Sequence, residues 1–131
     1  MNSRILKGIL LTCFMVLIVG CGNQPAFQLH KLKSGKEIKV LSVMPIHFTN
    51  DSPSLMLRYQ TNLKIDDKDA LRQEVGDIWG DFKAQVDKGN FSGAIISANE
   101  KPEGFILTHS KSYNFVFKKG SNGNWEMLSD K

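Results

Sequence analysis

Two segments in the first half of the chain alternate between apolar and polar positions. In residues 55–63 the apolar side chains occupy every second position and would lie on one face of a strand. Residues 36–44 alternate less strictly, and Pro45 then ends regular pairing or marks a sheet edge. Because a polar turn cluster at 50–54 separates the two segments, we expect two strands that can pair as a hairpin with a long loop.

A helical spacing of apolar residues follows between residues 66 and 89. Asp66 is the expected N-cap, and Gly89 is expected to close the helix. Apolar residues recur every three or four positions and therefore share one face, which predicts one amphipathic helix. These residues are Leu71, Val75, Ile78, Trp79, Phe82 and Val86.

Short strands are predicted again after the helix, at residues 93–98, 105–109 and 113–117, with a last one at 125–128. The tripeptide Ser121-Asn122-Gly123 is a strong hairpin signal. Up to residue 117 the expected order is β-β-α-β-β-β, without regular βαβ repetition, and the last short strand follows. We therefore predict an α+β domain, with an antiparallel sheet of about five strands and one amphipathic helix packed on it.

The N-terminal segment has a different pattern from the rest of the chain. Arg4 and Lys7 are its only charges, and residues 9–19 are nearly all apolar before Gly20 and Cys21. A positive start, a short apolar stretch and a small residue at the cut form the three-part layout of a secretory signal. The stretch is shorter than the roughly 20 residues that span a bilayer.

Residues Ile18-Val19-Gly20-Cys21 resemble the lipobox of bacterial lipoproteins. The resemblance implies cleavage between Gly20 and Cys21, and a diacylglycerol with fatty acyl chains such as palmitate on the Cys21 sulfur. Cys13 also lies in this segment, but Thr12 before it is a poor residue at a cleavage site. The mature part resembles small bacterial lipoproteins of unassigned function in general layout only.

The lipobox divides the chain into a signal peptide (1–20), a flexible tether (21–35) and a small α+β domain (36–131). The tether begins with small, polar residues and Pro25. The expected location is a cell membrane, lipid-anchored on the exported face. Gly22 is not Asp, which by resemblance to Gram-negative lipoproteins favours the periplasmic leaflet of the outer membrane; the rule does not apply to a Gram-positive source.

Composition and charge narrow the possible partners. The formal charge is +4, and removing Arg4 and Lys7 leaves a mature part near +2. No aromatic residue interrupts the one basic cluster, so nucleic acid is not an expected partner. This cluster is Lys31, Lys33, Lys36 and Lys39. Once the signal is removed Cys21 is the only cysteine, which leaves no disulfide within the mature chain.

Candidate chemistry is sparse. His30, His47 and His109 do not have zinc-ligand spacing, so neither a metal nor a cofactor is expected. Ser110 beside His109 is the nearest approach to a catalytic pair, but adjacent strand residues point to opposite faces. The acids at the helix start and along the helix are expected on its wet face: Asp66, Asp67, Asp69, Glu74, Asp77 and Asp81. No catalytic residue is predicted.

These observations favour a non-enzymatic, membrane-anchored interaction or envelope-maintenance module. Its expected partners are the membrane, through the lipid on Cys21, and an envelope protein. The alternative is a binder or carrier of a small apolar ligand between helix and sheet. An apolar cavity lined by Trp79, Phe82 and Tyr113 would favour the carrier, whereas a flat exposed apolar patch would favour the interaction module. A hydrolase using His109 is the third hypothesis.

Overall fold

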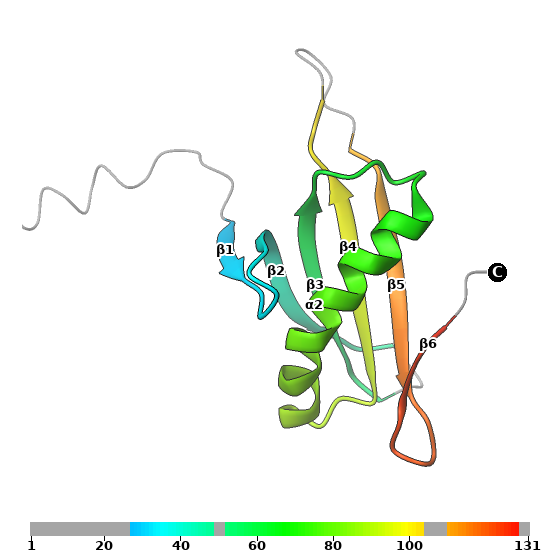
Figure 1. The fold of residues 1–131 in the computed structure, drawn as a ribbon. Coiled ribbons are helices and arrows are strands. Elements are labelled where there is room, and N and C mark those ends of the chain that lie inside the picture. The colour runs from blue at the N-terminus through cyan, green and yellow to red at the C-terminus, as the bar shows by residue number, and fades with distance from the viewer. Residues whose placement is uncertain (1–26, 49–51, 104–109, 129–131) are drawn as a thin grey trace, which may run out of the picture.

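The computed structural model describes residues 27–48, 52–103 and 110–128, which form one helix and one six-stranded sheet (Figure 1). The expected α+β class with a single helix is confirmed for these residues. Along the chain the elements are β1 (Gln28–Lys31), β2 (Glu37–Ile46), β3 (Ser54–Thr61), α2 (Lys68–Lys88), β4 (Gly93–Glu100), β5 (Ser112–Lys119) and β6 (Trp125–Met127).

The sheet follows the order of the chain, from β1 at one edge to β6 at the other. Four of the neighbouring pairs are antiparallel, but β3 and β4 are parallel. The prediction of a purely antiparallel sheet is therefore wrong at this pair. The physical reason is α2, which carries the chain back along the sheet so that β4 starts beside the start of β3 (Figure 1).

Strand β1 lies within the residues that were expected to be tether. It pairs antiparallel with β2, and Leu32 just after it is buried in the core. The ordered domain therefore begins before residue 36. All four side chains of β1 are exposed, so the strand has no apolar alternation by which to recognise it. The strand predicted at 105–109 lies outside the described residues.

Helix α2 begins and ends close to its predicted limits. Its N-cap is Asp67, one residue later than expected, and the Asp67 side chain accepts a hydrogen bond from the Ala70 amide at 3.3 Å. At the other end Gly89 keeps a right-handed conformation. The left-handed residue is Asn90, with φ 56°, which asparagine tolerates better than most residues.

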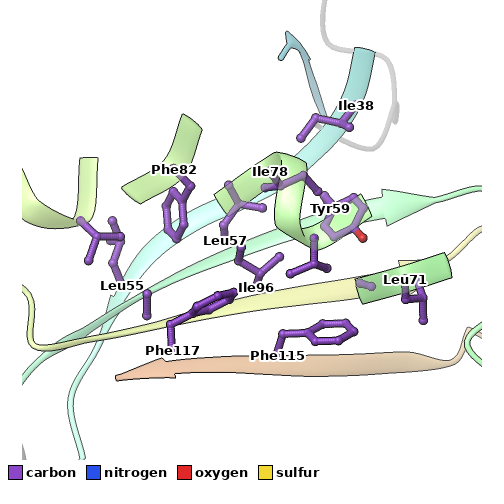
Figure 2. Close-up of a cluster of buried hydrophobic side chains, with 14 of the residues drawn as sticks. Ile38, Leu55, Leu57, Tyr59, Leu71, Ile78, Phe82, Ile96, Phe115 and Phe117 are labelled. Atoms are coloured by element: carbon purple, nitrogen blue, oxygen red, sulfur yellow. The ribbon is translucent and has the colours of Figure 1, made fainter. Parts of the chain in front are cut away.

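The core lies between α2 and one face of the sheet, the covered face (Figure 2). The predicted apolar stripe of the helix is buried against β3, β4 and β5. Fully buried side chains include Tyr59, Leu71 and Ile96. Trp79 is partly buried, with its ring stacked on Phe117 at a centroid distance of 4.1 Å. The opposite side of the sheet, which no described element covers, is called the open face below.

Candidate binding groove

A groove lies between the C-terminal half of α2 and the hairpin of β1 and β2. Its volume is about 360 Å³, at the lower end of the 300–1,000 Å³ typical of ligand pockets. Most of its lining residues are apolar, and they include Leu32, Ile38, Val40, Val43, Leu57, Ile78 and Phe82. Polar side chains stand among the lining residues at Gln28, His30, Asp81 and Gln85.

A bulge in β2 helps to form this groove. The pairing of β2 with β3 shifts between Val40 and Ser42, so one extra residue is inserted in β2. Val40 and Val43 pair with Tyr59 and Leu57, whose side chains are buried on the covered face. Bulges bend the strand that carries them. Val43 is still 40% exposed, which marks the open mouth of the groove.

Asp81 fastens the β1–β2 hairpin to the helix beside the groove. Its Oδ2 accepts a hydrogen bond from the Lys33 amide at 3.0 Å, and lies 3.8 Å from His30 Nε2. The Asp81 side chain is only 14% exposed, whereas His30 is largely exposed. The carboxylate therefore positions the hairpin loop and one edge of the groove.

A second carboxylate, two helical turns earlier, anchors the start of β2. The Glu74 side chain is 5% exposed and accepts a hydrogen bond from Lys36 Nζ at 2.6 Å. Its other oxygen accepts one from Thr61 Oγ1 at 2.7 Å. Glu74, Lys36 and Thr61 also line a smaller recess of about 240 Å³ beside the groove.

Tyr59 lies next to this cluster. Its hydroxyl is buried without a well-formed hydrogen bond among the described residues. Burial raises the pKa of the Tyr59 phenol, and the negative charge of Glu74 raises it further. The phenol stays protonated across the physiological range, so it is a neutral part of the wall and not a base or nucleophile.

The expectation that the acidic residues of the helix lie on its solvent-exposed face is wrong for Glu74 and Asp81. They are seven residues apart and lie on the same flank of α2, where the hairpin packs. The sequence signal for this was weak, because their burial depends on β1 and on the turn at 33–35, which alternation did not predict. The i, i+4 and i+7 spacing of Glu74, Ile78 and Asp81 was the available hint.

The other predicted site residues are not brought together. Gly20, Cys21 and His109 lie outside the described residues, and His47 is exposed after β2. Ser110 Oγ donates a hydrogen bond to the Glu100 carbonyl at 3.0 Å. Within the described ranges no group of three metal-ligating side chains occurs.

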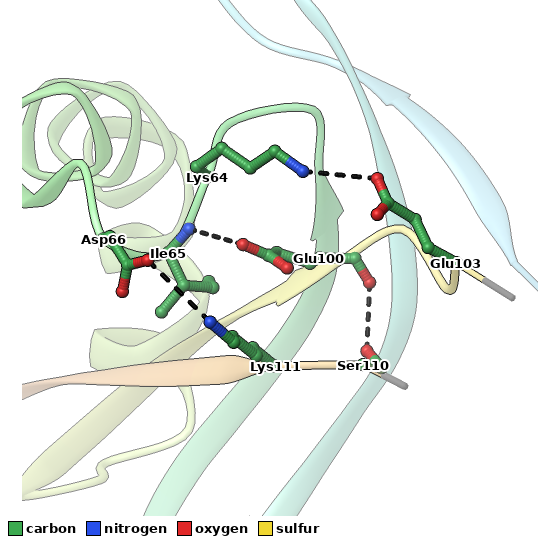
Figure 3. A network of polar contacts seen from close by, with 7 residues as sticks. All are labelled: Lys64, Ile65, Asp66, Glu100, Glu103, Ser110 and Lys111. Carbon is green, nitrogen blue, oxygen red and sulfur yellow. Dashed lines mark hydrogen bonds and ion pairs between the residues drawn. The ribbon is translucent and has the colours of Figure 1, made fainter. Parts of the chain in front are cut away.

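Ser110 belongs to a polar network that joins the end of β4 to the loop before α2 (Figure 3). The Glu100 carboxylate accepts a hydrogen bond from the Ile65 amide at 2.7 Å. Lys64 pairs with Glu103 at 3.2 Å, and Lys111 lies 3.8 Å from Asp66. Both ion pairs are exposed and worth little, so this network serves chiefly to position the loop.

The groove differs from the cavity lined by Trp79, Phe82 and Tyr113 that would favour the carrier. Of these three residues only Phe82 lines the groove, which opens on the β1–β2 flank of α2. Trp79 is packed on Phe117 on the other flank. Tyr113 lies edge-on to Phe115, with Lys68 Nζ 3.2 Å from its ring centroid.

The described chain is thus an α+β domain with one helix across a six-stranded mixed sheet and a groove at the helix flank. Searches of protein-family models, of curated proteins and of solved structures find no match to the chain. Among the described residues, α2 is not long and apolar enough to cross a membrane.

Proposed function

We propose that this protein is a lipid-anchored, non-enzymatic binding module of a bacterial cell envelope. The proposal places the anchor at Cys21, after removal of a signal peptide that ends at Gly20. The lipobox-like residues 18–21 and the apolar stretch before them support this anchor. In a Gram-negative source, Gly22 favours the periplasmic leaflet of the outer membrane.

The anchor is tested by expressing the full chain and its Cys21→Ala variant in the same cells. We expect the wild type to enter the detergent phase of a two-phase detergent extraction. The variant is expected to retain an uncut leader and to label no longer with a radioactive fatty acid. Equal fatty-acid labelling of both proteins would contradict acylation at Cys21.

The groove is the observation that supports a binding function. Its apolar walls and polar edge suit a small ligand with an apolar body and one hydrogen-bonding end. Asp81 is already engaged by the Lys33 amide, so Gln28, His30 and Gln85 are the other polar groups that can meet that end. This observation favours the carrier hypothesis, on a different flank of α2 from the one where Trp79 packs.

A matched pair of valines tests the groove. Val43 lines its mouth, whereas Val116 lies on the open face, and the two are 40% and 38% exposed. An anilinonaphthalene dye serves as the fluorescent probe, and apolar small molecules as competitors. Val43→Trp is expected to fill the mouth and remove the part of the dye signal that apolar competitors displace, and Val116→Trp to leave that part unchanged. Equal binding by both variants would contradict a ligand site there.

An envelope protein that inserts an apolar side chain is the other occupant of this groove. A photocrosslinking residue at position 43 in living cells distinguishes the two. A discrete protein adduct, absent when the same residue stands at position 116, would favour the interaction module over the carrier. Dye displacement without an adduct would favour the small ligand.

A further inference from the structure

A row of apolar side chains crosses the open face of the sheet. Residues paired on neighbouring strands point to the same side. Met44 pairs with Met56. Met56 in turn pairs with Ile95, which pairs with Val116. The Leu128 amide donates a hydrogen bond to the Val116 carbonyl at 2.8 Å, so Leu128 continues the row past β5.

The row is accessible from solvent. Met44, Val116 and Leu128 are exposed large apolar side chains, and Met56 and Ile95 are half-buried between them. A contiguous exposed apolar stretch on a small domain usually marks a surface that meets something apolar. In the described residues α2 lies entirely on the other side of the sheet (Figure 1).

Cations surround the row. The open face has four basic residues and two acidic residues, Glu37 and Glu126. Arg58, between the buried Leu57 and Tyr59, and Lys118, next to the buried Phe117, flank the row directly. Neither forms an ion pair with a described residue. The other two cations are Lys31 and Lys39.

The helix side has the opposite balance. Residues 66–88 contain seven acids and four basic residues. The domain therefore has a basic, apolar-striped face and an acidic helix segment on the opposite side. This charge asymmetry complements an anionic bilayer, because cations near an anionic leaflet each favour binding, and apolar side chains enter the headgroup boundary.

The proposed lipid anchor at Cys21 lies close in the chain to Phe27, on the open face, and would bring that face to the membrane. Phe27 is an exposed aromatic on this side of the sheet, with Lys39 Nζ 5.1 Å from its ring centroid. Only six residue steps separate Phe27 from Cys21. A chain of that length spans at most about 20 Å, so an acyl group on Cys21 would keep the domain against the bilayer surface.

We infer that the open face lies on the anionic lipid leaflet. The apolar row that runs from Met44 to Leu128 then lies against the headgroups, and the groove is turned away from the bilayer. This inference rests on the proposed anchor at Cys21. It makes the lipid surface itself the second partner of the domain, and leaves the groove accessible to its ligand.

Depth-dependent fluorescence quenching tests this orientation. The protein is purified from membranes in its acylated form and reconstituted in vesicles of phosphatidylethanolamine and phosphatidylglycerol with brominated chains. Met44→Trp reports on the open face, and Gln73→Trp on the exposed side of α2 is the matched neutral control. Trp79 and Trp125 give the same background in both variants.

We expect the tryptophan at position 44 to lose clearly more intensity to the brominated lipid than the one at position 73. The difference is expected to shrink in phosphatidylcholine vesicles and at high salt. Replacing Arg58 and Lys118 with glutamine is expected to weaken the membrane-facing orientation about fivefold for each cation removed. Circular dichroism of each variant confirms that the fold is kept.

Two results would overturn the orientation while Cys21 is shown by mass to be acylated. One is equal quenching at positions 44 and 73. The other is protection of position 44 from aqueous quenchers without quenching by lipid, together with a crosslinked dimer or a co-purifying protein. An unacylated Cys21 would instead overturn the proposed anchor, and with it the tether on which this inference rests.

Discussion

Ile95 and Ile96 are neighbours on β4, yet they belong to two different surfaces of the molecule. Ile96 points to the covered face and is fully buried beneath α2 (Figure 2), whereas Ile95 points to the open face and stays partly exposed. The covered face provides most of the apolar burial that holds the domain together. The open face keeps large apolar side chains such as Met44 and Val116 exposed, and so is available for a surface role.

The adjacent isoleucines provide the sharpest test of this difference. Ile96→Ala would leave a cavity under the helix and is expected to lower the free energy of unfolding by about 3–4 kcal/mol. Ile95→Ala removes a half-exposed side chain and is expected to lower it by only about 1 kcal/mol. Urea unfolding followed by circular dichroism measures both. Equal losses would mean that the open face is as much a core as the covered one.

Two hydroxyl groups extend the comparison to polar contacts. Thr61 Oγ1 donates to Glu74 and accepts from the Leu63 amide, whereas Ser42 Oγ on the open face is buried without a partner among the described residues. Thr61→Val is expected to destabilise by about 1–2 kcal/mol, because it leaves the buried Glu74 carboxylate short of a donor. Ser42→Ala is expected to be neutral. A neutral Thr61→Val would show that the Glu74 cluster does not fasten the hairpin.

Alkaline pH tests the burial of Tyr59 under the helix. Its pKa is raised in the folded protein above the ordinary value near 10, so the unfolded chain releases the phenol proton first. The protonated Tyr59 phenol therefore contributes its full stability to the fold below pH about 10. This contribution is lost as the pH rises above that value. Tyr59→Phe is expected to make the pH dependence of unfolding less steep in this range. An unchanged slope would contradict a buried, protonated phenol.

Apart from the neutral controls, the smallest expected effect is on the outer side of α2. Gly80 is exposed in the helix interior, and a Cβ built there meets nothing within 4 Å. Gly80→Ala is therefore expected to stabilise the domain by about 0.5–1 kcal/mol through helix propensity alone. Thermal unfolding measures this gain. A loss of stability would mean that this side of the helix packs against something the described residues do not include.

Elements with strong periodic patterns could be predicted from the sequence. The apolar stripe of α2 and the alternation of β3 each fix a buried face by local spacing, and both were placed correctly. Strand β1 was not predicted, because its four side chains are all exposed and its pairing with β2 is long-range. The parallel pairing of β3 with β4 likewise depends on how α2 crosses the sheet.

The groove could not be predicted for the same reason. It depends on the β2 bulge, on the unexpected β1 and on the packing of Glu74 and Asp81 under the hairpin, none of which has a strong local signature. A charged residue in a helix usually faces water. Only the packed hairpin turns the buried Glu74 and the half-buried Asp81 into acceptors for Lys36, Thr61 and the Lys33 amide.

The anchor at Cys21 is the claim on which both the location and the orientation depend, and intact-mass analysis of protein extracted from membranes tests it most directly. We predict a chain that starts at Cys21 and is heavier than residues 21–131 by a diacylglycerol group, with or without a further acyl chain. The bare mass of residues 21–131, or a chain that still carries residues 1–20, would contradict the account.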